Sequence, residues 1–221
     1  MSALEYLEIE TAPEPTVSVI WLHGLGASGH DFEPVIPELG LPDGAAVRFI
    51  FPHAPAIPVT VNGGMVMPAW YDIKAMDIDR VIDTEQLLAS AEAVGELVNR
   101  EIDRGIPASK IVIAGFSQGG AVAYQVALTF PERLAGVLGL STYFATAKSI
   151  QPSDANCNIP INVYHGTFDP VVPESLGVKA VETFKAMGFE PEYKTYPMEH
   201  SVCLEEVQDI GRFIRSHALL A

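Results

Sequence analysis

Positive charge is scarce in this sequence. Its 221 residues include 13 Lys and Arg against 28 Asp and Glu, which gives a formal net charge of -15. No Lys or Arg precedes Arg48. A surface of this sign repels nucleic acid and anionic lipid headgroups. We therefore expect neither nucleic acid nor stable membrane insertion, and no polyanionic partner.

Cysteines and long apolar runs are also few. Cys157 and Cys203 are too few for a disulfide scaffold or for the paired spacing of a zinc site, so we expect both thiols to be free. No uninterrupted apolar run approaches the roughly 20 residues of a membrane span. No basic segment followed by an apolar one opens the chain as in a signal peptide. These absences predict a cytoplasmic protein.

Hydrophobic residues are plentiful, at 48% of the chain, which favours one α/β domain over residues 1–221. Strand-like and helix-like segments alternate after residue 46, and this order predicts a mostly parallel sheet with helices on both faces. We expect strands at 47–51, 111–114, 134–140, 161–165 and 192–196, and helices at 84–104, 121–130, 174–187 and 204–217. Gly105 is the expected cap of the first of these helices.

Two regions depart from this alternation. Alternating segments at 4–10 and 16–22, separated by a proline-containing turn, predict an antiparallel pair. The stretch 52–79 is long and irregular, and inside it 59–67 is predicted to be a hairpin with a glycine-rich turn. Loops of that length usually carry function.

The most informative segment is Gly115-Phe116-Ser117-Gln118-Gly119, which follows an apolar run and precedes a helix-like segment. This pattern is typical of a strand-turn-helix elbow that forces the serine into a strained conformation. Glycines two residues on either side are expected to avoid a clash with that turn. We predict that Ser117 is a nucleophile with an exposed hydroxyl.

A serine hydroxyl needs a general base and a carboxylate that orients the base, and in such folds they follow in the chain order Ser, Asp, His. Asp169 comes directly after the predicted strand 161–165 and is our candidate acid. A purely structural Asp-Pro turn and Asp154 are the alternatives. His200 and His217 both follow Asp169. His200 lies between the last strand and last helix and is our candidate base, whereas His217 is expected to cap helix carbonyls.

The glycine loop after residue 22 allows two interpretations. Gly24, Gly26 and Gly29 match a dinucleotide-binding fingerprint, but the following strand ends without the carboxylate that binds a ribose. In a serine hydrolase the same loop presents an amide to the oxyanion, paired with the amide after the nucleophile. Those amides are the N–H groups of Leu25 and Gln118.

Three further residues lie close to the predicted site in sequence. Trp70 and Met67 are candidate lining residues of an acyl pocket, with packing against the sheet as the alternative. Cys203 follows His200 closely and is expected to be an inert thiol rather than an oxidant sensor.

Taken together, five motifs resemble the phospholipase/carboxylesterase family of α/β-hydrolases, which includes bacterial carboxylesterases and acyl-protein thioesterases. The resemblance covers the chain from about Val17 to the C-terminus. It implies an α/β-hydrolase fold without a large lid, Ser117, His200 and Asp169 as the triad, and the oxyanion hole named above. Glu199 stands where close bacterial relatives often carry glycine, which places a carboxylate beside the base. The motifs are His23-Gly24-Leu25-Gly26, Gly115-Phe116-Ser117-Gln118-Gly119-Gly120, Met67-Pro68-Ala69-Trp70-Tyr71-Asp72, His165-Gly166-Thr167-Phe168-Asp169 and Tyr196-Pro197-Met198-Glu199-His200.

The leading hypothesis is a serine carboxylesterase that cleaves carboxylic esters or thioesters of short to medium acyl chains through an acyl-enzyme, with no metal and no cofactor. An acyl-protein thioesterase or a lysophospholipase would use the same catalytic groups. A non-catalytic binding protein on a hydrolase scaffold is the distant alternative, because such proteins usually lose the serine or the histidine.

Overall fold

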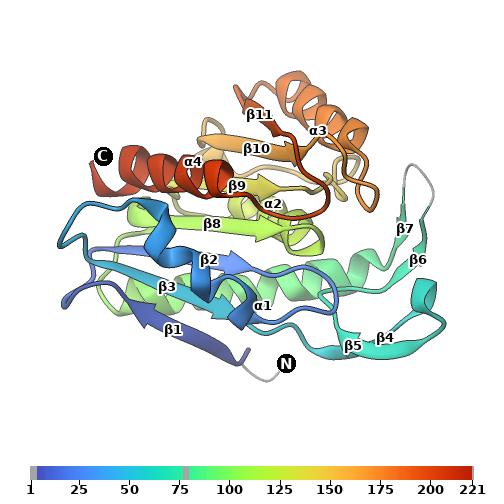
Figure 1. Cartoon of the computed structure of the whole chain (residues 1–221), viewed down its shortest axis with the longest axis horizontal. Helices are drawn as coiled ribbons and strands as arrows, with labels where there is room; N and C mark the ends of the chain where they lie inside the picture. Colours follow the sequence, from blue (N-terminus) through green and yellow to red (C-terminus); the bar gives the residue numbers. More distant parts are fainter. Residues whose placement is uncertain (1–3, 77–79, 221) are drawn as a thin grey trace.

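The computed structural model describes residues 4–76 and 80–220. Within them, seven strands form one sheet in the order β1-β3-β2-β8-β9-β10-β11 (Figure 1). Every neighbouring pair is parallel except β1 and β3. The sheet is therefore mostly parallel, as predicted. The strands are β1 (Tyr6–Glu10), β2 (Val17–Leu22), β3 (Val47–Pro52), β8 (Ile111–Phe116), β9 (Gly136–Leu140), β10 (Ile161–Gly166) and β11 (Glu192–Tyr196).

The N-terminal pairing differs from the prediction. β1 pairs with β3, from Tyr6 opposite Pro52 to Glu10 opposite Arg48, and does not pair with β2. Every residue of β2 is buried, and this strand lies between β3 and β8. β1 is only half-buried, which suits the edge of the sheet. Burial on both faces therefore decides the position of β2, and this outweighs the short connection between the two segments.

Helices cover both faces of the sheet, as predicted. Alternate residues of β2 point to opposite faces, so Ile20 belongs to the core cluster that includes residues of α1, α2 and α3, whereas Trp21 belongs to the cluster that includes residues of α4. Helix α1 begins with an Asp83 cap and is followed by Gly105 at φ 95°, which confirms the predicted cap residue. The helices are α1 (Thr84–Asp103), α2 (Gln118–Thr129), α3 (Glu174–Ala186) and α4 (Leu204–Ile214), the last continued by a π-helical turn, Arg215–Leu219.

Two short hairpins lie beyond the carboxyl ends of β2, β3 and β8 (Figure 1). β4 (Ala56–Val59) pairs with β5 (Met65–Pro68), and the turn between them has Gly63 and Gly64 at positive φ. This confirms the predicted hairpin, with boundaries shifted by a few residues. β6 (Ile73–Ala75) pairs with β7 (Val81–Ile82). The end of the predicted irregular region, 77–79, lies outside the described residues.

The remaining elements are short turns of 3-10 helix, Gly29–Asp31, Glu33–Leu39, Thr60–Asn62, Ala108–Lys110 and Asp154–Asn156. In the described part of the chain, no helix combines the length and the apolar character needed to cross a membrane.

Candidate active site

Ser117 lies at the turn between β8 and α2, in a backbone conformation that residues with side chains rarely adopt. Its φ is 53° and its ψ is -120°. The strained elbow predicted from sequence is therefore present. This turn places the serine at the carboxyl end of the central strand β8, next to the N-terminus of α2.

The glycines around Ser117 are required by close backbone approach. A Cβ at Gly115 would lie 2.3 Å from the carbonyl oxygen of Gly119. A Cβ at Gly119 would lie 2.5 Å from the carbonyl oxygen of His23. The elbow thus packs against its own backbone and against the loop after β2, which agrees with the expected need for glycine on either side of the turn.

The structure brings the three candidate triad side chains together from three loops. The hydroxyl oxygen Oγ of Ser117 lies 3.0 Å from Nε2 of His200, and Nδ1 of His200 lies 2.7 Å from Oδ2 of Asp169. These loops follow β8, β11 and β10, so they share the carboxyl edge of the sheet. A hydrogen-bonded chain from hydroxyl to imidazole to carboxylate is the arrangement that activates a serine.

Ser117 is more buried than its sequence motif predicts. Ser117 is only 8% exposed, although we predicted an exposed hydroxyl. The imidazole of His200 covers it, and the ring of Phe116 packs against that imidazole with centroids 4.7 Å apart. The nucleophile thus lies at the base of its loops and is not at the protein surface.

Asp169 is held as a carboxylate. Burial alone raises its pKa, but hydrogen bonds from His200 and from the N–H groups of Val172 and Val171 outweigh burial and hold the pKa of Asp169 below its usual value. Both backbone N–H groups donate to Oδ1, that of Val171 at 2.9 Å and that of Val172 at 2.8 Å, which leaves Oδ2 for the imidazole. Each oxygen of this carboxylate therefore has its own partners.

The alternative residues lie elsewhere. Asp154 starts the 3-10 turn before β10 and is not among the partners of His200. His217 lies in the π-helical turn after α4, where its ring contacts Phe213 at a centroid distance of 4.6 Å. Burial lowers the pKa of His217. Among the described contacts of His217 there is no hydrogen bond to a carbonyl, so the capping role that we expected is not observed.

The glycine loop after β2 lies against the nucleophile. A Cβ at Gly24 would approach the Ser117 Cβ to 3.4 Å, and the N–H of Gly26 donates to the carbonyl oxygen of Pro68. Gly29 opens only a 3-10 turn of three residues. A dinucleotide site needs a helix at this point to bind the pyrophosphate, so the fold here does not support the nucleotide interpretation.

A buried network, which sequence reasoning missed, supports this loop. The indole Nε1 of Trp70 donates to the carbonyl oxygen of His23, and the Trp70 N–H donates to the side-chain oxygen of Gln118. The His23 ring accepts at Nε2 from the N–H of Ala54 and therefore donates through Nδ1 to the Gly24 carbonyl. Burial lowers the pKa of His23, which keeps the ring neutral. Trp70, His23 and Gln118 lie within the predicted motifs, but no sequence pattern indicates that they contact one another.

Trp70 is 1% exposed and lies beneath the site, so the packing alternative describes it. Met67 is partly exposed, and its sulfur would lie 3.8 Å from a Cβ at Gly26, beside the glycine loop. Cys203 is partly exposed at the start of α4, and both cysteines are free thiols, as predicted.

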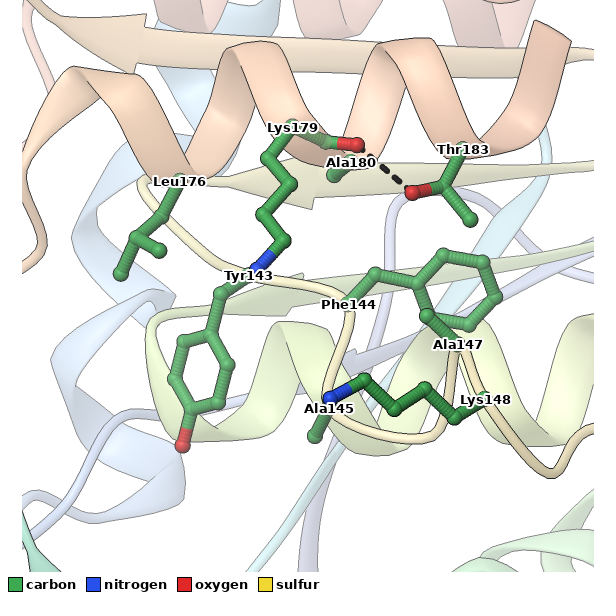
Figure 2. A pocket seen from close by; sticks show the side chains of 9 residues that line it. All are labelled: Tyr143, Phe144, Ala145, Ala147, Lys148, Leu176, Lys179, Ala180 and Thr183. Carbon is green, nitrogen blue, oxygen red and sulfur yellow. Dashed lines mark hydrogen bonds between the residues drawn. The ribbon is translucent and has the colours of Figure 1, made fainter. Parts of the chain in front are cut away.

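A cavity of about 110 Å³ lies between α3 and the loop after β9. Figure 2 shows the Lys179 side chain reaching from α3 toward it, with Tyr143 and Leu176 on one side and Phe144 on the other. No residue of the candidate triad or oxyanion pair lines this cavity. Tyr143 nevertheless contacts a residue of one of the five motifs, because its hydroxyl lies 2.7 Å from the hydroxyl of Tyr71.

Comparison with known proteins agrees with this geometry. The family model described as Phospholipase/Carboxylesterase matches residues 4–218. The chain belongs to this family. Curated relatives include acyl-protein thioesterase 1 of Gibberella zeae, 40% identical over 220 residues that cover 95% of this chain and 94% of the relative. The acyl-protein thioesterase 1 of Neurospora crassa is 41% identical over 210 residues, covering 90% and 86%.

A similar solved structure is acyl-protein thioesterase 2 of Zea mays, with a TM-score of 0.85 and 28% identity over 97% of this chain and 99% of that one. The phospholipase/carboxylesterase family and these relatives identify the protein as a serine hydrolase of the esterase or thioesterase type, with an α/β-hydrolase fold. The resemblance seen in the sequence is confirmed.

Proposed function

We propose that Ser117 is the nucleophile, His200 the general base and Asp169 the residue that orients the base. The observation that carries this proposal is the hydrogen-bonded chain from Ser117 Oγ through His200 to Asp169, at 3.0 and 2.7 Å. Because Asp169 accepts from Nδ1, the unprotonated Nε2 faces the serine and takes its proton as Oγ attacks the substrate carbonyl carbon.

The attack creates a tetrahedral oxyanion, which we assign to the N–H groups of Leu25 and Gln118. Gln118 begins α2, so its amide is among those without an intrahelical acceptor. The intermediate then collapses, the C–O or C–S bond breaks, and His200 returns its proton to the leaving alcohol or thiol. Water attacks the acyl-enzyme in the same way and releases the acid.

The substrates that we propose are carboxylic esters and thioesters of short to medium acyl chains. The name of the relatives from Gibberella zeae and Neurospora crassa supports thioesters, and the family description, Phospholipase/Carboxylesterase, supports oxygen esters. The secondary elements form no lid domain between β7 and α1, where the chain passes directly from the hairpin into the helix. A cytoplasmic location and the exclusion of nucleic acid stay predictions.

Labelling with a fluorophosphonate probe tests the catalytic assignment, because the probe traps only an activated serine. We expect the wild type to be labelled at Ser117 and Ser117→Ala to be unlabelled, with turnover of p-nitrophenyl butyrate reduced by roughly a million-fold. The variant should melt at the wild-type temperature or slightly above, because alanine removes no packing. Labelling at another serine, or turnover above a few per cent in the variant, would overturn the assignment.

A chain-length series then tests the substrate class. We expect kcat/KM to be highest for acyl groups of about four to eight carbons and similar for matched esters and thioesters, because the pocket binds the acyl group rather than the leaving atom. A maximum at long acyl chains presented on a peptide would instead favour an acyl-protein thioesterase, and a maximum on lysophospholipid would favour a lysophospholipase.

A further inference from the structure

The peptide group that joins Val171 to Val172 is held from both sides. Its N–H, on Val172, donates to Oδ1 of Asp169 at 2.8 Å. Its carbonyl oxygen, on Val171, accepts from Nη2 of Arg80 at 2.5 Å. A peptide group is planar, so fixing the direction of the carbonyl also fixes the direction of the N–H. Arg80 therefore determines the orientation of a hydrogen bond made to the candidate triad acid.

Electrostatics act in the same direction as geometry. A cationic donor on the Val171 carbonyl polarises the peptide group, which makes the Val172 N–H a stronger donor to Asp169. The hydrogen bonds thus form one continuous chain with Arg80 at one end and Ser117 at the other. The adjacent carbonyl, on Val172, is fixed separately by Nε2 of the fully buried His165 at 2.8 Å.

Arg80 makes several contacts besides the one with Val171. It is 9% exposed, its guanidinium lies 4.9 Å from the centroid of the Tyr143 ring, and Nη1 contacts the sulfur of Met76 at 2.9 Å. Its backbone has a φ of 35°, a left-handed value that costs free energy for a residue with a side chain. A buried arginine in a strained conformation persists only where its contacts stabilise it by more than this cost.

We propose that Arg80 is a positioning residue for catalysis: it holds the Val171–Val172 peptide group so that the Asp169 carboxylate keeps its orientation toward His200. The role rests on the triad of the proposed function. Arg80 contacts neither the nucleophile nor the base, so it acts on the reaction only through the acid. Its loss should therefore lower kcat, which depends on imidazole orientation, and leave KM nearly unchanged.

The test is a double-mutant cycle measured with p-nitrophenyl butyrate. We expect Arg80→Met to lower kcat about 10- to 100-fold with KM changed less than about twofold, as for a displacement of about 1 Å at a catalytic group. Arg80→Lys retains a cationic donor and should recover most of the lost kcat. In an Asp169→Asn background, Arg80→Met should lower kcat by less than about a further twofold, because the carboxylate that orients the His200 imidazole is already absent.

Arg48→Met is the matched control. Arg48 is also buried, at 8% exposed, but it lies on β3 and pairs with Glu10 and Glu101. This variant should lower the melting temperature and leave kcat per folded molecule unchanged. If Arg80→Met does not fold, Arg80→Lys takes its place in the same cycle, with a smaller loss of kcat that also disappears in the Asp169→Asn background.

The outcomes separate the two proposals. Wild-type kcat in Asp169→Asn would overturn the triad assignment itself. A large loss in Asp169→Asn, combined with wild-type kcat in Arg80→Met, would overturn only the role of Arg80. A rise in KM without a fall in kcat would also overturn the role of Arg80. The same holds if Arg80→Met lowers kcat by the same factor in the Asp169→Asn background as in the wild type, because either result would show that Arg80 acts independently of Asp169.

Discussion

Arg48 and Arg80 are both buried arginines, 8% and 9% exposed, but their surroundings differ. Arg48 is neutralised by carboxylates, with Nε 2.9 Å from Glu10 and Nη1 2.8 Å from Glu101. The described partners of Arg80 are a carbonyl oxygen, a sulfur atom and an aromatic face. Carboxylates compensate the buried charge of Arg48, whereas the neutral partners of Arg80 leave its charge able to polarise the peptide group beside the acid.

The same contrast holds for the two regions as a whole. Around Arg48, a network of ion pairs includes Arg104, which bonds to Glu8 and Glu101. Around Ser117, the structure instead contains a strained serine and a carboxylate held by hydrogen bonds. Substitutions in the ion-pair region should therefore change stability without changing turnover, and substitutions at the carboxyl edge should do the reverse.

The largest effect is expected at the candidate base. His200→Ala should reduce turnover by roughly a million-fold, as for other triad members, because no group then accepts the serine proton. His217→Ala, at the far end of α4, should leave turnover and its acidic pH limb unchanged. Steady-state kinetics across pH measure both. Loss of activity in His217→Ala instead of His200→Ala would reverse the assignment.

A smaller effect is expected at the oxyanion loop. Leu25→Pro deletes one N–H donor and should lower kcat by about 10²- to 10³-fold, with any added distortion increasing the loss. Leu25→Ala keeps the amide and should retain substantial activity. Equal kcat in Leu25→Pro and wild type would show that this loop does not bind the oxyanion, and a rise in melting temperature with NAD would restore the nucleotide interpretation.

In the ion-pair region, Glu101→Ala should lower the free energy of unfolding by about 3 kcal/mol, because it leaves Arg48 buried without its main partner. Glu101 is fully buried and also accepts from the Ser18 hydroxyl at 3.1 Å. Glu10→Ala is the matched control, and its effect should stay below about 1 kcal/mol because Glu10 is more exposed. Urea denaturation gives both values, while kcat per folded molecule should stay constant. A fall in kcat would contradict the separation of the two regions.

The last effect depends on pH and is measured as a slope of stability against pH. Glu206, in the first turn of α4, is fully buried, and burial raises its pKa to about 8. The folded state therefore binds this proton more tightly than the unfolded chain does. Stability contributed by the neutral carboxyl is complete below about pH 4.5 and is lost as pH rises toward about 8, at up to about 1.4 kcal/mol per pH unit.

Glu206→Gln should flatten this dependence, because the amide stays neutral in both states. Denaturation at several pH values between about 5 and 8 measures the slope. Glu205→Gln, one residue earlier and exposed, is the control, and it should leave the slope nearly unchanged. An unchanged slope in Glu206→Gln would show that another group is responsible.

Local sequence patterns predicted most of the elements and the candidate triad, because both depend on short segments. The elbow around Ser117, the acid after β10 and the base after β11 each follow a recognisable strand. The pairing of β1 with β3 could not be predicted in this way. An edge strand differs from a central strand in how far its second face is buried, and that burial depends on elements that are distant in sequence. The contacts of Trp70 and Arg80 were equally hidden, since each joins segments that are distant in sequence.

The interlocking of the acid and base loops has a consequence for folding. A Cβ at Gly166 would lie 2.4 Å from the carbonyl oxygens of both Met198 and Glu199, and the N–H of Phe168 donates to the Met198 carbonyl. These contacts exist only once β11 has joined the edge of the sheet beside β10. A refolding chain should therefore recover ester hydrolysis no earlier than this strand docks, so the return of turnover during refolding reports on the docking of β11.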